Sequence, residues 1–314
     1  MTHIPLRSKI LASGEILGIT AIWGVSFAIM KNAMDILPPL WFLTCRFALA
    51  FFLLTLMNIH KIKTLRWKHL REAFLLGTPL AFGYAMQTLG LNLTTASNSA
   101  FITGTYVVFI PLIGWLVTRR LQPRQLVIAL IACIGLSGLS LDSNLQINIG
   151  DLLVLAGAVG YAAHFLILDH YTKGYDSLLI TGLQVASSTV LLAIAALLFE
   201  PLPTAASFPP TVLQALLFTG ILCTVLGFWV QSSAQKALPP TTASILFTAE
   251  SVFGALFGVL LLHEQLIPRQ IAGGLLLVAC MVASVTGKEG DTPAAPSKPA
   301  PVSNRHIDGT EASQ

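Results

Sequence analysis

Residues 87–114 read QTLGLNLTTASNSAFITGTYVVFIPLIG, and residues 231–258 read QSSAQKALPPTTASILFTAESVFGALFG. The residues that recur at a constant offset of 144 include Gln87 and Gln231, Phe109 and Phe253, and Gly114 and Gly258. One inserted residue further on, Pro123-Arg124-Gln125 returns as Pro268-Arg269-Gln270. The chain therefore contains two copies of one design.

The composition assigns both copies to a membrane. Of the 314 residues, 54% are hydrophobic and only 10% are charged, and the mean hydropathy is +0.76, whereas an ordinary soluble domain is about 25% charged. A helix needs about 20 apolar residues to cross the hydrocarbon core. The sequence predicts ten such spans, at residues 14–32, 38–58, 72–91, 96–118, 125–141, 151–170, 177–199, 211–235, 241–262 and 269–287. We therefore expect an all-α polytopic membrane protein.

The number of spans in each copy predicts how the copies are related. Because five is odd, the second copy must enter the bilayer in the opposite orientation, which gives ten transmembrane helices as two inverted five-helix repeats. Such repeats meet around a midplane site in many secondary transporters. The expected units are a cytoplasmic N-terminal segment (1–13), a first repeat (14–141), an external linker (142–150), a second repeat (151–287) and a cytoplasmic tail (288–314). The tail is polar and rich in proline, serine and alanine, so it is predicted to be disordered.

Basic residues predict the orientation in the membrane. With a cytoplasmic N-terminus, 15 of the 18 lysines and arginines fall on the inner side. The positive-inside rule then places both termini in the cytoplasm, and we expect a multi-pass protein of a bacterial-type inner membrane. The basic loop at residues 61–71 fits this topology and contact with lipid headgroups, so no nucleic-acid partner is predicted.

Two charged residues lie near the middle of predicted spans, Glu250 in the ninth and Arg46 in the second. A charge at the bilayer centre costs about 3 kcal/mol on an insertion scale, so it needs a cavity, a partner or a proton. Glu250 is predicted to contact the substrate or to couple protons, and Arg46 to bind a substrate carboxylate. The alternatives are a structural carboxylate bonded to a neighbouring helix and an ion pair between the two residues.

Five uncharged residues complete the predicted site. Tyr106 is the repeat partner of Glu250, and Gln87 and Gln231 lie at mirrored depths in their spans. Asn98 belongs to a dense group of polar residues on the fourth span, and Trp23 precedes a glycine in the first. These side chains are suited to bonding or stacking with a polar ligand. Their alternative role is bonding between helices, where one hydrogen bond contributes about 0.6 kcal/mol.

The sequence contains no recognisable catalytic or metal-binding pattern. HExxH, Walker A and GxSxG motifs are absent from it. The four cysteines lie in apolar segments without the spacing of a metal site and are interpreted as free thiols. We therefore predict no enzyme, no catalytic residue, no metal and no cofactor.

Several segments together resemble the EamA family of the drug/metabolite transporter superfamily, over about residues 10–287. They are Trp23-Gly24-Val25-Ser26-Phe27, Arg46 and residues 95–101, 106–111, 250–253 and 261–266. The resemblance implies a ten-helix inner-membrane carrier with a central cavity lined by spans one, three, four, six, eight and nine. Members of that family mostly export amino acids, other metabolites or toxic compounds, and some take up nutrients; dimers occur among them, so a homodimer is one arrangement that the resemblance suggests. Three positions depart from the family pattern, which has a proline at Ser251, a glycine at His263 and an acidic residue at Arg120.

The predicted function is secondary transport by alternating access. The expected substrate is a small polar or amphipathic metabolite, an amino acid or a related compound, which is exported; protons are the candidate coupling ion. One alternative is an exporter of toxic or drug-like compounds or nucleobases. The alternatives from other classes are a membrane-embedded lipid-handling enzyme and a non-transporting scaffold.

Overall fold

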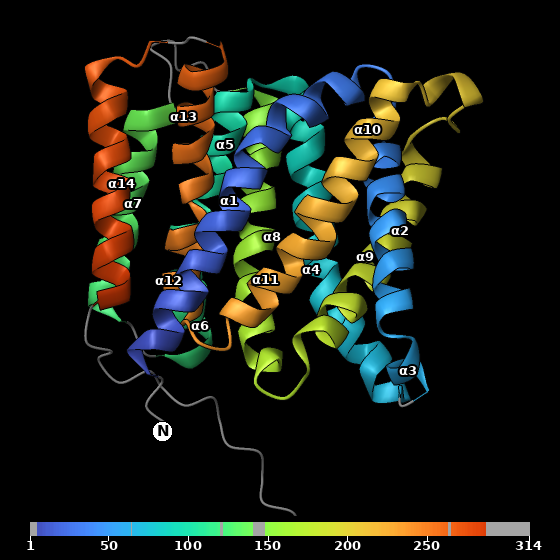
Figure 1. Ribbon diagram of the computed structural model, residues 1–314, viewed down its shortest axis with the longest axis horizontal. Helices are drawn as coiled ribbons and strands as arrows, with labels where there is room; N and C mark the ends of the chain where they lie inside the picture. Colours follow the sequence, from blue (N-terminus) through green and yellow to red (C-terminus); the bar gives the residue numbers. More distant parts are fainter. Residues whose placement is uncertain (1–4, 64, 120–121, 141–147, 263–264, 287–314) are drawn as a thin grey trace, which may run out of the picture.

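The computed structural model describes residues 5–63, 65–119, 122–140, 148–262 and 265–286, which form a bundle of helices (Figure 1). The helices of the first half are α1 (Leu6–Met34), α2 (Pro39–Met57), α3 (Ile59–Ile62), α4 (Trp67–Leu93), α5 (Ala96–Gly104), α6 (Tyr106–Thr118) and α7 (Pro123–Ser140). Those of the second half are α8 (Ile149–Thr172), α9 (Ser177–Phe199), η1 (Ala205–Ser207), α10 (Pro210–Phe218), η2 (Thr219–Leu226), α11 (Gly227–Ala234), α12 (Pro240–Phe247), α13 (Ala249–Leu262) and α14 (Pro268–Thr286). We call the two ends of the bundle the α3 end and the α5 end, after the helices that lie there in Figure 1.

Seven helical segments among the described residues are long and apolar enough to cross a membrane. They are α1, α2, the α5–α6 pair, α8, α9, the α10–α11 segment and α14. Helix α7 contributes a shorter apolar stretch, Pro123–Leu139. The chain is therefore a multi-pass membrane protein, and the count of ten spans stays a prediction.

Several helices extend beyond the predicted spans. Helix α1 begins at Leu6 rather than at residue 14, and α4 begins at Trp67 rather than at residue 72. Hydropathy detects the edge of the hydrocarbon core, whereas a helix continues until its end is capped. Helix α8 begins at Ile149, inside the expected linker, because Asn148 and Asp151 form a capping box there. The rest of that linker, residues 142–147, and the tail at 288–314 lie outside the described residues.

The fourth and ninth predicted spans are each divided into two helices, at Thr105 and Thr248. Each threonine hydroxyl donates to the carbonyl three residues earlier, at 2.5 Å for Thr105 to Ile102 and 2.6 Å for Thr248 to Ile245. Such side-chain bonds compete with the regular helix pattern. The two copies are therefore interrupted at nearly equivalent positions, one residue before Tyr106 and two residues before Glu250.

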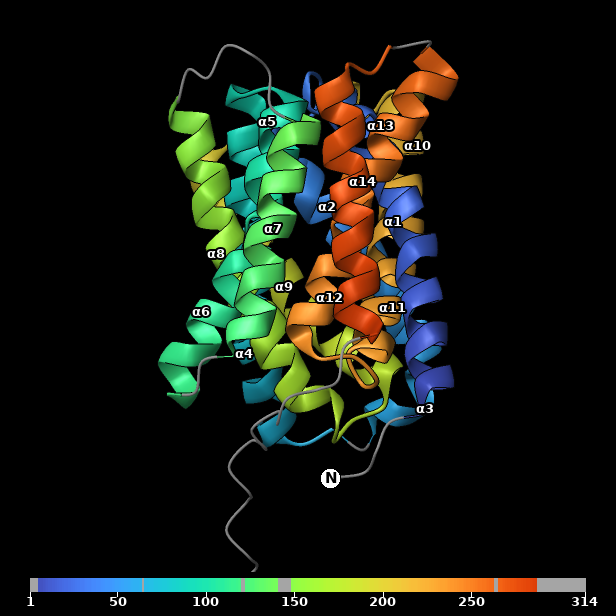
Figure 2. The same cartoon turned by 90° about the vertical axis from the view of Figure 1, so that its left-hand side faces the viewer.

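Helices of the two halves of the sequence pack against each other. Helix α2 packs on α9, α4 on α8, α1 on α13, and α7 on α14, and Figure 2 shows the last pair side by side. Glycines permit this approach, since a Cβ on Gly273 of α14 would lie 2.6 Å from the Leu139 nitrogen of α7. The second helix of one half thus pairs with the second of the other, and the last with the last.

Contacts near both ends of the bundle join the segment that holds α2, α3 and α4 to the segment that holds α8 and α9. Near the α5 end, the Glu200 carboxylate accepts hydrogen bonds from the backbone N–H groups of Leu40 (2.9 Å) and Trp41 (3.0 Å). At the α3 end, Lys61 Nζ lies 2.7 Å from Asp176 Oδ1, and Tyr175 donates to Glu72. These contacts connect segments that are more than 100 residues apart in the sequence.

Asp176 also caps helix α9, because its carboxylate accepts a hydrogen bond from the Leu179 N–H at 3.1 Å. The hydrogen bond from Lys61 holds the pKa of Asp176 below its usual range, and the Leu179 N–H acts in the same direction. We expect Asp176→Ala to lower the free energy of unfolding by about 1 kcal/mol at neutral pH, the typical contribution of an N-cap. A lowered folded-state pKa means that this contribution is lost as the pH falls through that pKa. Thermal unfolding of both proteins should therefore differ at neutral pH and converge in acid, whereas a constant difference would contradict the assignment.

Candidate functional site

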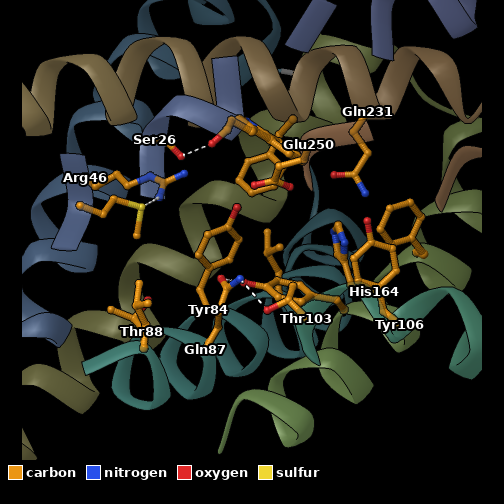
Figure 3. Close-up of a pocket in the computed structure, with 17 residues that line it drawn as sticks. Ser26, Arg46, Tyr84, Gln87, Thr88, Thr103, Tyr106, His164, Gln231 and Glu250 are labelled. Carbon is orange, nitrogen blue, oxygen red and sulfur yellow. Dashed lines mark hydrogen bonds between the residues drawn. The ribbon is translucent and has the colours of Figure 1, made fainter. Parts of the chain in front are cut away.

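The centre of the bundle contains a cavity of about 70 Å³ (Figure 3). Its lining side chains come from α1, α2, α4, α5, α6, α8, α11 and α13. Six of the seven predicted site residues line it: Glu250, Arg46, Tyr106, Gln87, Gln231 and Trp23. All six spans that the family resemblance implies contribute to the cavity, and α2 is added through Arg46. The cavity therefore collects residues from both halves of the sequence.

Arg46 is 2% exposed and is fixed by several partners. Its Nε donates to Thr224 Oγ1 at 2.7 Å, and its Nη1 lies 3.4 Å from the Met30 sulfur. The guanidinium carbon lies 5.2 Å from the centroid of the Tyr84 ring, a cation–π distance. A guanidinium has five N–H donors, so this arrangement leaves donors directed at the cavity.

A π-helical segment, η2, supplies two of the contacts that position this side of the cavity. Thr224 lies in η2, and the neighbouring Cys223 carbonyl accepts a 3.0 Å hydrogen bond from Trp23 Nε1. The Trp23 ring stacks on Phe247 at 5.2 Å between centroids and fits against Gly227, where a Cβ would lie 2.8 Å from the indole. π-Helical turns are frequent at functional sites, and here the wider turn positions Arg46 and Trp23.

Glu250 lies in the first turn of α13, directly after the break at Thr248. In the view of Figure 3 its carboxylate lies between Arg46 and Gln231. Within the described part of the chain, the carboxylate has no hydrogen bond and no ion pair within 4.0 Å. Neither structural alternative, an ion pair with Arg46 or a bond to a neighbouring helix, is formed in this structure.

Gln87 is oriented by two neighbours. Its amide nitrogen donates to Thr103 Oγ1 at 2.9 Å, and its carbonyl accepts from the Tyr161 hydroxyl at 2.6 Å. The next residue of α4, Thr88, also lines the cavity, and its buried hydroxyl has no partner among the described residues. A buried hydroxyl without a partner is costly, so this part of the cavity is suited to a ligand or water that bonds to it.

A second polar network leads from the cavity toward the α3 end. His164 Nε2 lies 2.7 Å from Gln184 Oε1, and Gln184 Nε2 lies 3.4 Å from Ser232 Oγ. Thr181 continues the series with a 3.0 Å bond to Ser232. Close to it, Gln231 Nε2 lies 3.4 Å from Gln235 Oε1. All of these side chains are buried, so the network connects the cavity with the interior of the α3 half.

Aromatic rings surround this network. Phe165 lies 5.4 Å from Tyr106 and 5.7 Å from Phe247 between ring centroids. Phe228 lies 5.9 Å from Tyr84, and both Phe228 and Phe247 are fully buried. The polar wall of the cavity is thus bordered by a packed aromatic cluster.

The structure does not bring Asn98 to the cavity. Thr103 of the same helix lines it, and five residues correspond to a rotation of about 140° around an α-helix. Asn98 instead contributes its backbone N–H to the cap of α5, at 3.1 Å from Thr95 Oγ1. Its predicted contact with substrate stays a prediction.

The cavity residues that had no part in the predicted site include Tyr84, Tyr161 and Thr88. Tyr84 lies three residues before Gln87, and Tyr161 three residues before His164, which is the spacing of one helix face. That spacing could have predicted both tyrosines, because the residues on one face of a helix usually line the same site. Thr88 had no such signal, since a single threonine is common in membrane helices.

Comparisons with known proteins identify the family of the chain. The EamA-like transporter family matches residues 12–141 and 148–286. An uncharacterized transporter of Archaeoglobus fulgidus is 33% identical, with 84% of this chain and 82% of the relative covered. The uncharacterized transporter YoaV of Bacillus subtilis is 25% identical, with coverages of 83% and 92%.

A solved crystal structure supports the fold alone. It superimposes with a TM-score of 0.71 at 16% identity and covers 89% of this chain and 96% of its own. The family match extends over most of the chain in two consecutive segments. The chain therefore belongs to the EamA-like transporter family and is a membrane transporter.

Proposed function

We propose that this transporter exports a small polar or amphipathic metabolite, an amino acid or a related compound, by alternating access through the central cavity. The observation that carries the proposal is the pair of charged side chains in one cavity, Arg46 and Glu250, which are not joined to each other. A buried charge is stable only with a partner. A substrate that carries both an anionic and a cationic group supplies a partner for each.

The distribution of basic residues indicates the orientation of the protein in the membrane, and the pairing of helices from the two halves supports alternating access. Eleven of the fourteen lysines and arginines in the described residues lie toward the α3 end: Arg7, Lys9, Lys61, Lys63, Arg66, Lys68, Arg71, Arg119, Arg124, Lys173 and Lys236. By the positive-inside rule the α3 end is cytoplasmic, as both termini would be, in a bacterial-type inner membrane. The pairing of α2 with α9 and of α7 with α14 fits a two-fold axis between inverted five-helix repeats.

Proton coupling is part of the proposal. Glu250 is the carboxylate that changes charge within the cavity, and the network from His164 through Gln184 to Ser232 extends from the cavity toward the α3 end. A chain of hydrogen-bonding side chains is a suitable route for protons. Loading Glu250 alternately with a proton and with substrate would couple the two movements.

Flat aromatic compounds are a second candidate substrate class. The specific observation in their favour is the number of aromatic side chains in the lining, among them Trp23, Tyr84, Tyr106 and Phe228. Such rings stack on planar ligands and attract cations. Nucleobases and drug-like cations are the compounds of this class to be tested.

Uptake of a labelled amino-acid panel by proteoliposomes, with and without a pH gradient, tests the proposal. We expect saturable uptake of one class of amino acid and faster uptake with the gradient. Protein-free liposomes and liposomes with Arg46→Ala are the controls. If folded protein takes up no amino acid but does take up a nucleobase or an aromatic cation, the second candidate replaces the first.

A further inference from the structure

A long groove runs along the outer surface of the bundle between α4 and α8. Its volume is about 660 Å³, and its walls include Phe74, Thr78 and Phe82 of α4 and Val159 and Ile167 of α8. Phe82 and Val159 are 46% and 42% exposed, so they face the lipid rather than the central cavity. The groove shares no lining residue with that cavity.

Close contact of the two helix backbones forms the floor of the groove. A Cβ on Gly160 would lie 3.0 Å from the Pro79 carbonyl oxygen and 3.1 Å from the Gly83 nitrogen. The Phe82 ring packs on Gly160, since a Cβ there would lie 2.9 Å from Phe82 Cδ1, and the flanking side chains of both helices stand as walls. The result is a groove on the surface that follows the axis of α4.

The length of the groove matches one leaflet of a bilayer. Arg71 and Phe82 mark its two ends on α4, and eleven residues of α-helix rise about 16 Å. Half of a hydrocarbon core of about 30 Å is about 15 Å. The groove therefore has the length of one acyl chain in the leaflet at the α3 end.

The end of the groove that lies toward the α3 end of the bundle is basic. The exposed Arg71 guanidinium lines it, and Lys68, also exposed, lies three residues earlier on the same face of α4. Trp67, which is 83% exposed, begins the helix, and tryptophan is typical of the headgroup level. No acidic residue is found in the lining that the structure describes. A basic pocket between membrane helices is suited to an anionic headgroup.

We propose that this groove binds an anionic phospholipid, with one acyl chain between α4 and α8 and the phosphate at Arg71. The apolar walls hold the chain, and the charge selects an anionic over a zwitterionic headgroup. The site does not depend on which substrate the transporter carries or on whether transport is coupled to protons.

The site can be tested with the purified full-length protein and a tryptophan placed in the groove, Val159→Trp. Vesicles of phosphatidylcholine receive increasing fractions of phosphatidylglycerol whose acyl chains carry bromine, which quenches nearby tryptophan. The emission of the unsubstituted protein, measured in parallel, is subtracted. We expect quenching of the introduced tryptophan at phosphatidylglycerol fractions well below those that bulk mixing would require, and no such preference for brominated phosphatidylcholine.

Three further substitutions, each made separately in the Val159→Trp protein, distinguish the effect of charge from that of shape. Arg71→Gln should raise the phosphatidylglycerol fraction needed for half-quenching about fivefold, the effect of one basic residue near a membrane surface. Arg7→Gln, the same charge change at the start of α1, should leave the curve unchanged. Thr78→Phe, which fills the groove and keeps Arg71, should weaken quenching by the anionic lipid.

Three results would overturn the site. Quenching that follows the bulk lipid fraction would show that the groove has no preference for an anionic headgroup. Equal effects of Arg71→Gln and Arg7→Gln would show that only the general surface charge matters. A tryptophan that no brominated lipid quenches would show that protein, for example a second copy of the chain, covers the groove.

Discussion

Substitution Glu250→Gln is expected to lower gradient-driven uptake by about ten- to hundredfold, because a hydrogen bond to a charged group contributes about 1.5–3 kcal/mol. Glutamine keeps the size of the side chain and removes its charge and its titration. Coupling requires a group that binds and releases a proton in the cavity, and Glu250 is the carboxylate that lines it. The remaining uptake should therefore no longer depend on the pH gradient.

The same substitution distinguishes a functional carboxylate from a structural one. Within the described residues Glu250 holds no hydrogen bond or ion pair, and a charge near the bilayer centre is unfavourable by about 3 kcal/mol on an insertion scale. Glu250→Gln should therefore leave the thermal unfolding temperature equal or higher. A marked fall in that temperature would assign Glu250 a structural role.

Glu15→Gln is the matched control for this experiment. Glu15 lies on α1 with its side chain exposed on the surface of the bundle, and it does not line the central cavity. Its substitution should leave both the rate of uptake and its pH dependence unchanged. If Glu250→Gln and Glu15→Gln behave alike in proteoliposomes, the proposed coupling through Glu250 is wrong.

Gly24→Val is expected to lower the free energy of unfolding by about 1–3 kcal/mol, the usual cost of inserting carbon atoms into a packed interior. A Cβ on Gly24 would lie 2.9 Å from the Glu250 carbonyl oxygen and 2.9 Å from the Gly254 nitrogen. Both are backbone atoms of α13, so no side-chain rotation can relieve the contact. Helix α1 must then move away from α13, and Glu250 shifts relative to the rest of the cavity.

Gly18→Val provides the control for this substitution on the same helix. A Cβ on Gly18 meets no atom within 4 Å, so its effect should stay within about 0.5 kcal/mol. Thermal unfolding and proteoliposome uptake of the two variants give the comparison. We expect Gly24→Val to unfold at a lower temperature and to lose transport, while Gly18→Val keeps both. Equal behaviour of the two variants would show that the α1–α13 contact tolerates displacement.

The sequence was sufficient to select the residues of the cavity that carry charge. Glu250 and Arg46 stood out because a charge within an apolar span is costly wherever the span packs. Gln87 and Gln231 stood out through the repeat. Asn98 was predicted from its polarity alone, and it is not among the residues that line the cavity. Polarity gives no information about the face of the helix on which a residue lies.

The breaks in the fourth and ninth spans were not predicted. Hydropathy is continuous through Thr105 and Thr248, and neither position carries a proline or glycine. The interruption arises from threonine hydroxyls that bond to the preceding turn, a local choice that hydropathy does not record. The π-helical segment η2 escaped prediction for the same reason.

The sequence by itself determined the class of the molecule, because the bilayer imposes a length and an apolar composition on every span, and both can be read along the chain. It also determined the family, since the motifs of both repeats can be recognised in the amino-acid sequence. Only the tertiary structure decided that Arg46 and Glu250 share one cavity without pairing, and that Gly160 leaves a groove between α4 and α8. These features depend on distances between helices that are far apart in the sequence, and such distances are set by side-chain packing across the bundle.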